Sequence, residues 1–337
     1  MLFLRLIQDR LRILSRLSIM RVINLLLLRI SFRFSQVSGR VWHAGLPFAL
    51  SVEPTTQCTL RCPECPVGAG ILQRARGTMD LGFFRSLVDE VSGTVFWMNL
   101  YFQGEPLLHA RLPEIIAHAD KMHIYTVLST NAQQLDSEMA EKLVKSGLSR
   151  IIISLDGAKR ESYEQYRRGG NFEQVLEGTR LLVAARRKLR SRIPFIQVQC
   201  LVFSHNEQEI KSVRQLALDL GADQLVLKSA QILNLLKPVM QLPEQPDYSR
   251  YLASEGTELR LKKTNSGLCY RMWSSAVITW DGLLVPCCYD KEAEYSFGSL
   301  NETSFSKRWK GSNADHFRRM VLHSRQNVPI CRNCPEP

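Results

Sequence analysis

Two hydrophobic patterns alternate along the middle of this chain. Segments with the pattern of buried strands are each followed by a longer segment in which apolar residues recur at helical spacing. The strands are expected at 49–53, 96–102, 124–129, 150–155, 195–203 and 224–228. Helices between them are expected at 80–92, 111–120, 136–146, 171–190 and 207–220. Repeated strand-then-helix units predict an α/β fold built on a parallel sheet.

The first 35 residues carry a different pattern and are expected to form a helix. Leucine, isoleucine and methionine dominate, and neither glycine nor proline occurs before residue 39. One face gathers polar residues at helical spacing: Arg5, Asp9, Arg12 and Arg16. A basic amphipathic helix of this kind fits two alternatives, contact with a membrane surface or packing on the rest of the protein or on a second copy.

Prolines and turn residues divide the remainder of the chain. Pro238, Pro243 and Pro246 interrupt the alternation, so residues 236–268 are interpreted as a linker. Beyond it, the apolar segment 277–286 has Asp-Gly at its centre, which predicts a hairpin. We therefore expect four parts, at 1–45, 46–235, 236–268 and 269–337.

Charge is concentrated at the N-terminus. The net charge of the 337 residues is +12, and residues 1–40 contribute +7 of it through eight arginines and one aspartate. The rest of the chain is therefore only mildly basic and has no signature of a nucleic-acid-binding module, so nucleic acid is not an expected partner. The longest apolar runs near the N-terminus, such as Leu25–Leu28, are too short to span a bilayer.

Three of the nine cysteines form the strongest chemical signal. Cys58, Cys62 and Cys65 follow the first expected strand at a spacing that suits a loop around one corner of a [4Fe–4S] cluster. Three ligands would leave one iron open for chemistry. A zinc site or a set of disulfides is the alternative, but no histidine lies near the loop and the chain carries no export signal. Nine cysteines without such a signal indicate metal binding in a reducing compartment, and hence a cytoplasmic protein.

This Cys-x3-Cys-x2-Cys loop after a first strand resembles the radical S-adenosylmethionine (SAM) superfamily, although Glu64 stands where an aromatic residue is common. The resemblance implies a partial (β/α)6 barrel of the TIM type. It also implies that SAM chelates the open iron and is cleaved reductively to a 5′-deoxyadenosyl radical, which takes a hydrogen atom from the substrate. A reduced flavodoxin or ferredoxin would supply the electron.

Turns after the next strands match further motifs of that family. Gly104, Glu105 and Pro106 resemble its Gly-Glu-Pro turn, in which the glutamate contacts the amine of SAM. Asn131 lies in a turn similar to Thr-Asn-Gly. The turn that follows the fourth strand contributes Ser154 and Asp156. Arg167, with Arg168 as the adjacent alternative, matches an arginine that pairs with the SAM carboxylate.

Polar side chains on the last two strands leave two interpretations open. Gln197 and Gln199 share one face of the fifth strand and either face a polar lumen or bond to neighbouring backbone. Lys228 ends the sixth strand, where it is either an anchor for an anionic substrate group or a solvated strand end.

A second cysteine set lies near the C-terminus. It resembles the SPASM domains of radical SAM enzymes in their shorter twitch form, in which four cysteines hold one auxiliary [4Fe–4S] cluster; the matching positions are Cys269, Cys287, Cys331 and Cys334. Cys288 competes with Cys287 as a ligand, and a zinc site is the alternative. Asp290 lies close by and either takes a substrate proton or caps the loop.

The two cysteine sets together predict an oxidoreductase. The layout resembles twitch enzymes that oxidise a cyclitol alcohol, so we expect a two-electron oxidation of a sugar, a cyclitol or a lipid-linked glycan. A peptide-modifying maturase is the rival within the same family. An iron–sulfur electron carrier or a zinc-bound scaffold is the rival of another class. A cytoplasmic location is expected, with a peripheral position on the inner membrane surface depending on residues 1–35.

Overall fold

A nine-stranded sheet forms the frame of the molecule in the computed structural model, which describes residues 2–252, 258–263 and 268–335. The strand order is β11-β10-β9-β1-β2-β3-β4-β5-β6. The strands have the bounds Ala49–Val52 (β1), Trp97–Asn99 (β2), Tyr125–Thr130 (β3), Arg150–Ser154 (β4), Phe195–Val202 (β5), Gln224–Ser229 (β6), Ser275–Ile278 (β9), Leu283–Val285 (β10) and Gly298–Ser299 (β11).

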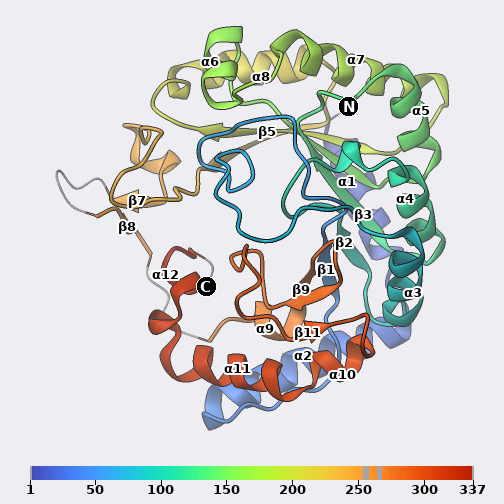
Figure 1. The fold of residues 1–337 in the computed structure, drawn as a ribbon. Helices are drawn as coiled ribbons and strands as arrows, with labels where there is room; N and C mark the ends of the chain where they lie inside the picture. The colour runs from blue at the N-terminus through green and yellow to red at the C-terminus, as the bar shows by residue number, and fades with distance from the viewer. Residues whose placement is uncertain (1, 253–257, 264–267, 336–337) are drawn as a thin grey trace.

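Strands β1 to β6 run parallel, and helices cover the outside of their curved sheet (Figure 1). These helices are α3 (Leu81–Val91), α4 (Leu112–Lys121), α5 (Ser137–Lys145), α6 (Arg160–Tyr166), α7 (Phe172–Lys188) and α8 (Ile210–Asp219). The α/β fold, the partial barrel and all six expected strands are confirmed. The five expected helices are also present; α6 was not expected.

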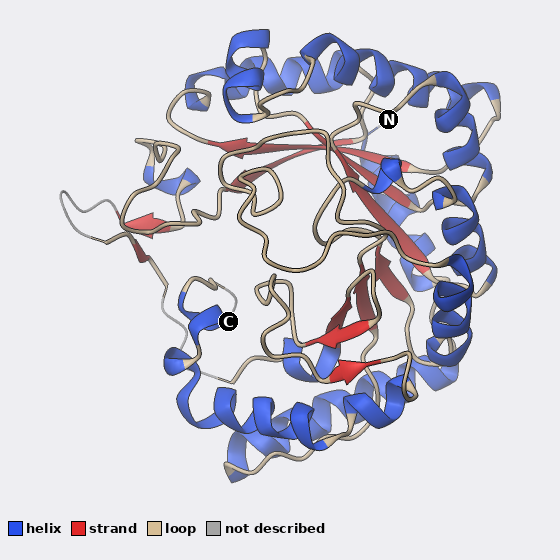
Figure 2. Ribbon diagram, in the orientation of Figure 1, coloured by secondary structure: helices blue, strands red, loops and turns tan. Residues whose placement is uncertain are grey.

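Local sequence explains why these helices begin where they do. The carboxylate of Asp80 accepts a hydrogen bond from the amide of Phe83 and caps α3, and Asp136 caps α5 in the same way. Such side-chain caps satisfy amides that have no partner inside the helix. Each helix then turns its apolar face onto the sheet, where residues such as Phe84 and Leu143 are fully buried. Helices and loops alternate around the sheet in Figure 2.

The C-terminal part of the chain extends the barrel sheet. Strand β9 pairs in parallel with β1, from Ala49 opposite Ser275 to Val52 opposite Ile278. The expected hairpin is present, because β10 pairs antiparallel with β9 and Gly282 takes a positive φ of 86° at the turn. Helices α9 (Arg271–Ser274), α10 (Phe305–Trp309), α11 (Ser312–Ser324) and α12 (Pro329–Arg332) complete this part.

The segment interpreted as a linker contains the short strands β7 (Tyr251–Leu252) and β8 (Arg260–Leu261), which pair antiparallel. Residues 253–257 and 264–267 of that segment lie outside the described residues. The division of the chain into four parts stays a prediction.

Two helices, rather than one, form the N-terminal segment. Helix α1 (Leu2–Leu14) and helix α2 (Ile19–Ser38) are separated by a turn, and Ser18 caps the second. The polar face of α1 points inward, because Asp9 bonds to Arg150 and to Tyr125 near the starts of β4 and β3. Arg12 and Arg16 bond to Asp120 at 2.9 and 2.5 Å. Helix α1 thus closes the end of the barrel at which the strands begin, and packing on the protein is confirmed. None of the described helices is long and apolar enough to cross a membrane.

Candidate active site

The first cysteine loop receives hydrogen-bond donors from three directions. The amide of Leu60 lies 3.4 Å from Cys58 Sγ, and Nδ2 of Asn131 lies 3.8 Å from the same sulfur. An NH1 group of Arg167 lies 3.9 Å from Cys62 Sγ. Burial raises the pKa of Cys58 to about 11, so a bound metal would be needed to hold it as a thiolate. Donors aimed at buried sulfurs suit thiolates that carry negative charge on a metal.

The turn at Gly104 brings the next motif against this loop. Gly104 has a φ of 79°, and a Cβ there would meet the carbonyl oxygen of Thr55, so only glycine fits. Glu105 is buried and accepts hydrogen bonds from the Thr130 hydroxyl at 2.6 Å and from the Asn131 amide at 2.7 Å. Burial raises the pKa of Glu105, and these bonds partly oppose the rise. Pro106 begins the 3-10 turn that follows.

Arg167, and not Arg168, is the arginine directed at the cysteine loop. Its Nε lies 2.5 Å from the buried carboxylate of Asp156, which also accepts the Leu201 amide at 2.6 Å. Burial alone would lower the pKa of Arg167, but Asp156 and Cys62 hold it well above its ordinary value. Arg168 is exposed. Asp156 therefore positions the side chain of Arg167. The backbone of Arg167 is placed by helix α6, which ends at Tyr166.

Ser154 is buried at the end of β4, with its backbone in the sheet. Glu64, the departure from the usual cysteine motif, has a structural explanation. Its carboxylate accepts hydrogen bonds from the amides of Leu233, Val239 and Met240 at 2.7, 2.9 and 3.2 Å. It thereby fastens the segment after β6 over the cysteine loop. No local pattern could have predicted these partners, which lie about 170 residues further along the chain.

The C-terminal cysteines gather around a second arginine. Arg325 lies 3.9 Å from Cys334 Sγ. Its positive charge opposes the rise that burial causes in the pKa of Cys269 and of Cys331. The pKa of Cys287 is raised by burial and by the nearby Cys288, Cys269 and Cys331. Cys287 thus shares its surroundings with two members of the predicted set. Cys288 lies 3.9 Å from an NH1 group of Arg271.

Asp290 is turned into its own loop. Its carboxylate accepts hydrogen bonds from the amides of Glu294 and Tyr295 at 2.9 and 3.0 Å. Burial raises the pKa of Asp290 to about 6. The contacts of Asp290 therefore cap its loop. Asp290 is not among the described residues that line the large cavity described below. The adjacent Lys291 does line that cavity.

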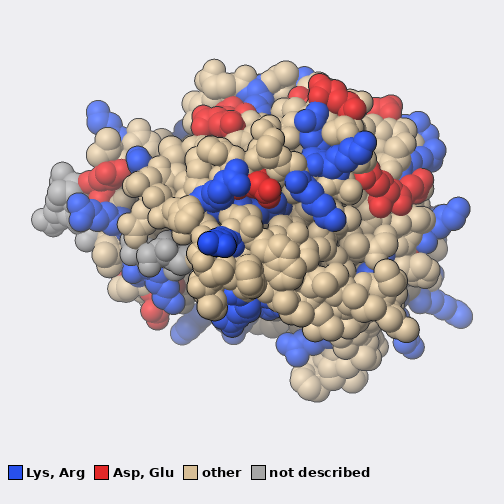
Figure 3. Space-filling view, turned by 90° about the horizontal axis from the view of Figure 1, so that it is seen from below, with Lys and Arg blue, Asp and Glu red and all other residues tan. Residues whose placement is uncertain are grey.

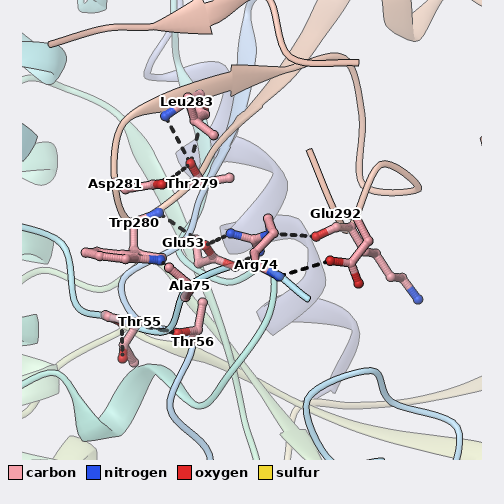
Figure 4. Close-up of polar contacts among 12 residues, drawn as sticks. Glu53, Thr55, Thr56, Arg74, Ala75, Thr279, Trp280, Asp281, Leu283 and Glu292 are labelled. Carbon is pink, nitrogen blue, oxygen red and sulfur yellow. Dashed lines mark hydrogen bonds and ion pairs between the residues drawn. The ribbon is translucent and has the colours of Figure 1, made fainter. Parts of the chain in front are cut away.

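A buried ion pair of the barrel also contacts the C-terminal part of the chain, and sequence reasoning missed it. Arg74 binds both carboxylate oxygens of Glu53 at 2.7 and 3.0 Å, and its Nε donates to the carbonyl of Lys291 at 2.6 Å (Figure 4). Glu53 also accepts the amide of Trp280, and Glu292 accepts that of Arg74. Glu53 is fully buried, and burial raises its pKa although Arg74 opposes the rise. The contacts link the end of β1 to the C-terminal part.

A cavity of about 700 Å³ lies between the two cysteine sets. Glu64 and Tyr166 line it beside the first set, and Cys287 and Cys288 line it beside the second. Gln199 faces it, as one interpretation of the fifth strand expected, whereas Gln197 is not among its described lining residues and lies 3.4 Å from Arg150. A molecule in the cavity would touch the surroundings of both cysteine sets.

Within the described residues, no group of three or more His, Cys, Asp or Glu side chains is close enough to hold a single metal ion. An iron–sulfur cluster makes a different demand, because its cysteines bind separate irons. The buried sulfurs, the donors aimed at them and the arginine beside each set fit such clusters.

Comparison with known proteins agrees with this geometry. The family model of the radical SAM superfamily matches residues 52–217, and that of the SPASM iron–sulfur cluster-binding domain matches residues 269–335. The chain belongs to the radical SAM superfamily and carries a SPASM domain. Its cofactors are accordingly [4Fe–4S] clusters and SAM. Membership of this enzyme family argues against the electron carrier and the zinc scaffold.

Individual relatives differ in their chemistry. The chain is 30% identical over 177 residues to an AdoMet-dependent heme synthase of Methanosarcina barkeri, covering 52% of this chain and 48% of the relative. It is 24% identical over 323 residues to a cofactor-modifying protein for tungsten-containing aldehyde ferredoxin oxidoreductase of Pyrococcus furiosus, covering 85% and 86%. The chain therefore spans about half the length of some curated relatives.

Solved structures share the fold. SuiB of Streptococcus suis with bound SAM superposes with a TM-score of 0.63 at 12% identity, covering 91% of this chain and 76% of SuiB. BtrN in complex with AdoMet and 2-DOIA superposes with a TM-score of 0.51 at 17% identity, covering 87% and 94%. At these identities the likeness concerns the fold alone.

Proposed function

We propose that this radical SAM enzyme catalyses a two-electron oxidation of a C–H bond beside a hydroxyl group, in a sugar, a cyclitol or a lipid-linked glycan. The observation that carries the proposal is the cavity between the two cysteine sets, which Glu64 lines beside the first set and Cys287 lines from the second. When bound, the cofactors would supply the chemistry: SAM cleavage would provide the radical that takes the hydrogen atom, and the second cluster would accept the remaining electron while the hydroxyl proton leaves to solvent.

The residues of the chain would hold and orient these groups. Cys58, Cys62 and Cys65 would bind the first cluster, and Cys269, Cys287, Cys331 and Cys334 the second. Glu105 and Arg167 would bind the charged ends of SAM, because one is an acid and the other a cation beside the first set. The barrel wall would shield the site from water.

Anaerobic reconstitution tests the cluster assignment. The wild-type protein should bind about eight irons per chain, as two [4Fe–4S] clusters require. The C58A/C62A/C65A variant should bind about four and lose SAM cleavage. The control is C200A, because Cys200 is a buried cysteine of β5 outside both sets. Four or fewer irons in the wild-type protein would refute the two-cluster assignment.

The oxidation itself needs a separate test. The protein would be reduced with electrons from a flavodoxin or ferredoxin and then incubated with SAM and fractions of a deuterated cell extract. Deuterium in 5′-deoxyadenosine identifies the fraction that holds the substrate, and a product two hydrogens lighter supports oxidation. A product of unchanged mass would contradict it.

A peptide-modifying activity is the second candidate. A PqqA peptide cyclase of Xanthomonas campestris is 27% identical over 187 residues, covering 55% of this chain and 47% of the relative. The same deuterium experiment separates the two candidates, because a peptide fraction rather than a glycan or small-molecule fraction would carry the label.

We also propose that the enzyme works in the cytoplasm at an anionic membrane surface. Helices α1 and α2 bury some of their polar side chains, among them Asp9, Arg21 and Asn24, and expose an apolar face. Its exposed members are Phe3, Leu4, Ile7, Leu11, Leu14, Ile19, Met20, Val22, Ile23, Leu26, Leu27, Ile30, Phe34 and Val37. Apolar faces of this extent on a described surface call for a covering partner.

Charge favours anionic lipid as that partner over a second copy of the chain. Arg10, Arg29, Arg33 and Arg40 are exposed in the same segment, and its single acid, Asp9, is buried. Two copies meeting at this face would bring arginines together without acids to pair them. Seen from the side on which α2 lies, a broad area has few charged side chains, and those at its margin are mostly basic (Figure 3).

Vesicle flotation tests the membrane proposal. Full-length protein should float with vesicles containing phosphatidylglycerol, and less with phosphatidylcholine vesicles, because each arginine near an anionic surface contributes about 1 kcal/mol. The I23D/L27D variant should stay in the dense fraction. L218D is the matched control, because Leu218 of α8 is similarly exposed (46%, against 44% and 40%) but lies outside the apolar face. Equal flotation of the I23D/L27D and L218D variants would overturn the proposal.

A further inference from the structure

The cavity between the cysteine sets has an uneven distribution of charge. Its described lining residues include four cations, and Glu64 is the only acid among them. The Glu64 carboxylate is already satisfied by three backbone amides. The cations of the lining are Lys228, Arg250, Arg271 and Lys291.

Two of these cations have a role beside the cysteines. Arg271 lies 3.9 Å from Cys288 Sγ. The ammonium of Lys291 donates to the side chain of Gln231 at 3.1 Å, and it lies close enough to Cys65 and Cys288 for their charges to oppose the lowering of its pKa by desolvation. Both therefore offset the negative charge of thiolates, at least in part. The inference that follows rests on Lys228 and Arg250.

Neither Lys228 nor Arg250 has an acidic partner among the described residues. Arg250 donates to the carbonyl and the hydroxyl of Ser229, at 2.6 and 3.1 Å, and to the hydroxyl of Tyr289 at 3.3 Å. No described residue accepts a hydrogen bond from the ammonium of Lys228. Neutral partners hold Arg250 in place at the end of β6, beside Lys228, without neutralising it. An anion bound there would gain charge-assisted hydrogen bonds from both.

Other lining residues are polar but uncharged. They include Ser51, Asn99 and Gln199, from β1, β2 and β5. The amide oxygen of Gln103 is buried, and it has no hydrogen-bond partner among the described residues. A buried acceptor of this kind is costly unless a ligand supplies a donor. Hydroxyl groups of a ligand would supply such donors.

We propose that the cavity binds a substrate that carries both a phosphate group and hydroxyl groups, with Lys228 and Arg250 holding the phosphate. This inference rests on the proposed oxidation of an alcohol and narrows its substrate to phosphorylated polyols and sugars, whether free or joined to a lipid through phosphate. The cavity volume of about 700 Å³ lies within the usual range of small-ligand sites, about 300–1,000 Å³.

Phosphate binding can be measured without turnover. The probe is glucose 1-phosphate, with glucose as its neutral counterpart, added to reconstituted full-length protein saturated with S-adenosylhomocysteine, a thioether that is not cleaved reductively, so that Arg167 and the first cysteine set are occupied without turnover. Binding is followed by ³¹P relaxation after reduction with dithionite, because a paramagnetic cluster shortens the relaxation time only of a phosphate bound nearby. Saturable relaxation enhancement is expected with the wild-type protein.

Matched variants locate the site. K228Q/R250Q should weaken the enhancement at least tenfold in apparent affinity, with its iron content unchanged. K237Q/R260Q removes the same charges from exposed residues outside the cavity lining and should bind like the wild-type protein. Absence of enhancement in the wild-type protein, or equal loss in both variants, would overturn the inference.

Two further measurements are needed. The first distinguishes a lipid-linked phosphate from a free one, and the second distinguishes failure of this inference from failure of the proposed function. A short-chain polyprenyl phosphate that competes with the probe indicates a lipid-linked substrate, whereas competition by sugar phosphates alone indicates a free one. Failure of SAM cleavage in the wild-type protein would refute the proposed function while leaving the phosphate measurement interpretable.

Discussion

Arg74 is a buried residue whose contacts connect the barrel to the C-terminal part of the molecule. The R74M variant leaves the carboxylate of Glu53 buried without its cation. Breaking a buried pair in this way costs about 3–5 kcal/mol, so the free energy of unfolding should fall by that amount in anaerobic urea denaturation.

The control for R74M is R85M. Arg85 pairs with Glu114 at 3.4 Å where both side chains are nearly half exposed, and such pairs contribute about 0–1 kcal/mol. If both variants lost the same small amount of stability, Arg74 would not have the role assigned to it.

His43 makes a pH-dependent contribution at the same scale. It lies against Trp273 and accepts from the indole of Trp309, and burial, assisted by the charge of Arg318, lowers its pKa to about 3. Between pH 6.5 and 3 the unfolded chain binds a proton at this histidine and the folded protein does not. Stability should therefore fall as the pH is lowered below about 6.5, by up to about 1.4 kcal/mol per pH unit.

The H43Q variant tests this contribution, because glutamine keeps an acceptor and does not titrate. Urea unfolding at pH 5, 6 and 7 should show a shallower pH dependence than in the wild-type protein. H323Q, at an exposed position of α11, should leave the slope unchanged. An unaltered slope in H43Q would contradict the assignment.

Helix α1 is an element held in place by its polar face. Asp9 neutralises Arg150 and bonds to Tyr125 beneath the barrel. In D9A these groups lose a buried partner, which is costly, so α1 should leave the barrel more often. Amide hydrogen exchange over residues 2–14, measured by mass spectrometry, should become at least tenfold faster.

R10A is the comparison for D9A, because Arg10 is exposed on the same helix. Its exchange should match the wild-type protein. Protection of α1 that survives in D9A would mean that apolar contacts alone hold the helix.

Elements were more predictable from the sequence than the contacts between them. The strand expected at 195–203 is found at Phe195–Val202, because its apolar pattern and flanking helices are local signals. Helix α6 was missed, since seven residues carry too little periodicity. The orientation of α1 could not be predicted, because polar residues at helical spacing can face either water or a buried partner such as Asp120.

The candidate site divides in the same way. Cysteine spacing and the Gly104-Glu105 turn could be predicted because their chemistry depends on short sequence intervals. The partners of Glu64 and the pair of Glu53 with Arg74 could not, because the fold brings together residues that are 169 and 21 positions apart along the chain. The contacts of Asp290 are local, and capping its loop was one of the two interpretations of that residue.

At the scale of the whole molecule, the barrel and the C-terminal part share one sheet. A chain ending at residue 268 would lack β9 and leave β1 as an open edge. Unpaired edges of apolar strands promote aggregation, so the truncated protein should be largely insoluble on expression and should elute as aggregate in gel filtration.

The C331S/C334S variant provides the contrast. It removes two predicted ligands of the second cluster but keeps β9, and it should remain soluble. A soluble, monomeric truncated protein would show that β9 is not needed to complete the barrel.

The pairing of β1 with β9 also bears on electron transfer. The first cysteine set follows β1, and Cys287 follows the hairpin that β9 begins, so the pairing of β1 with β9 brings the segments that carry these cysteines to neighbouring strands of one sheet. Electron tunnelling decays steeply with distance. A sheet shared by the two sets would hold the segments that carry them at a constant separation. In the proposed oxidation, electron transfer from the substrate radical to the second cluster would depend on that separation.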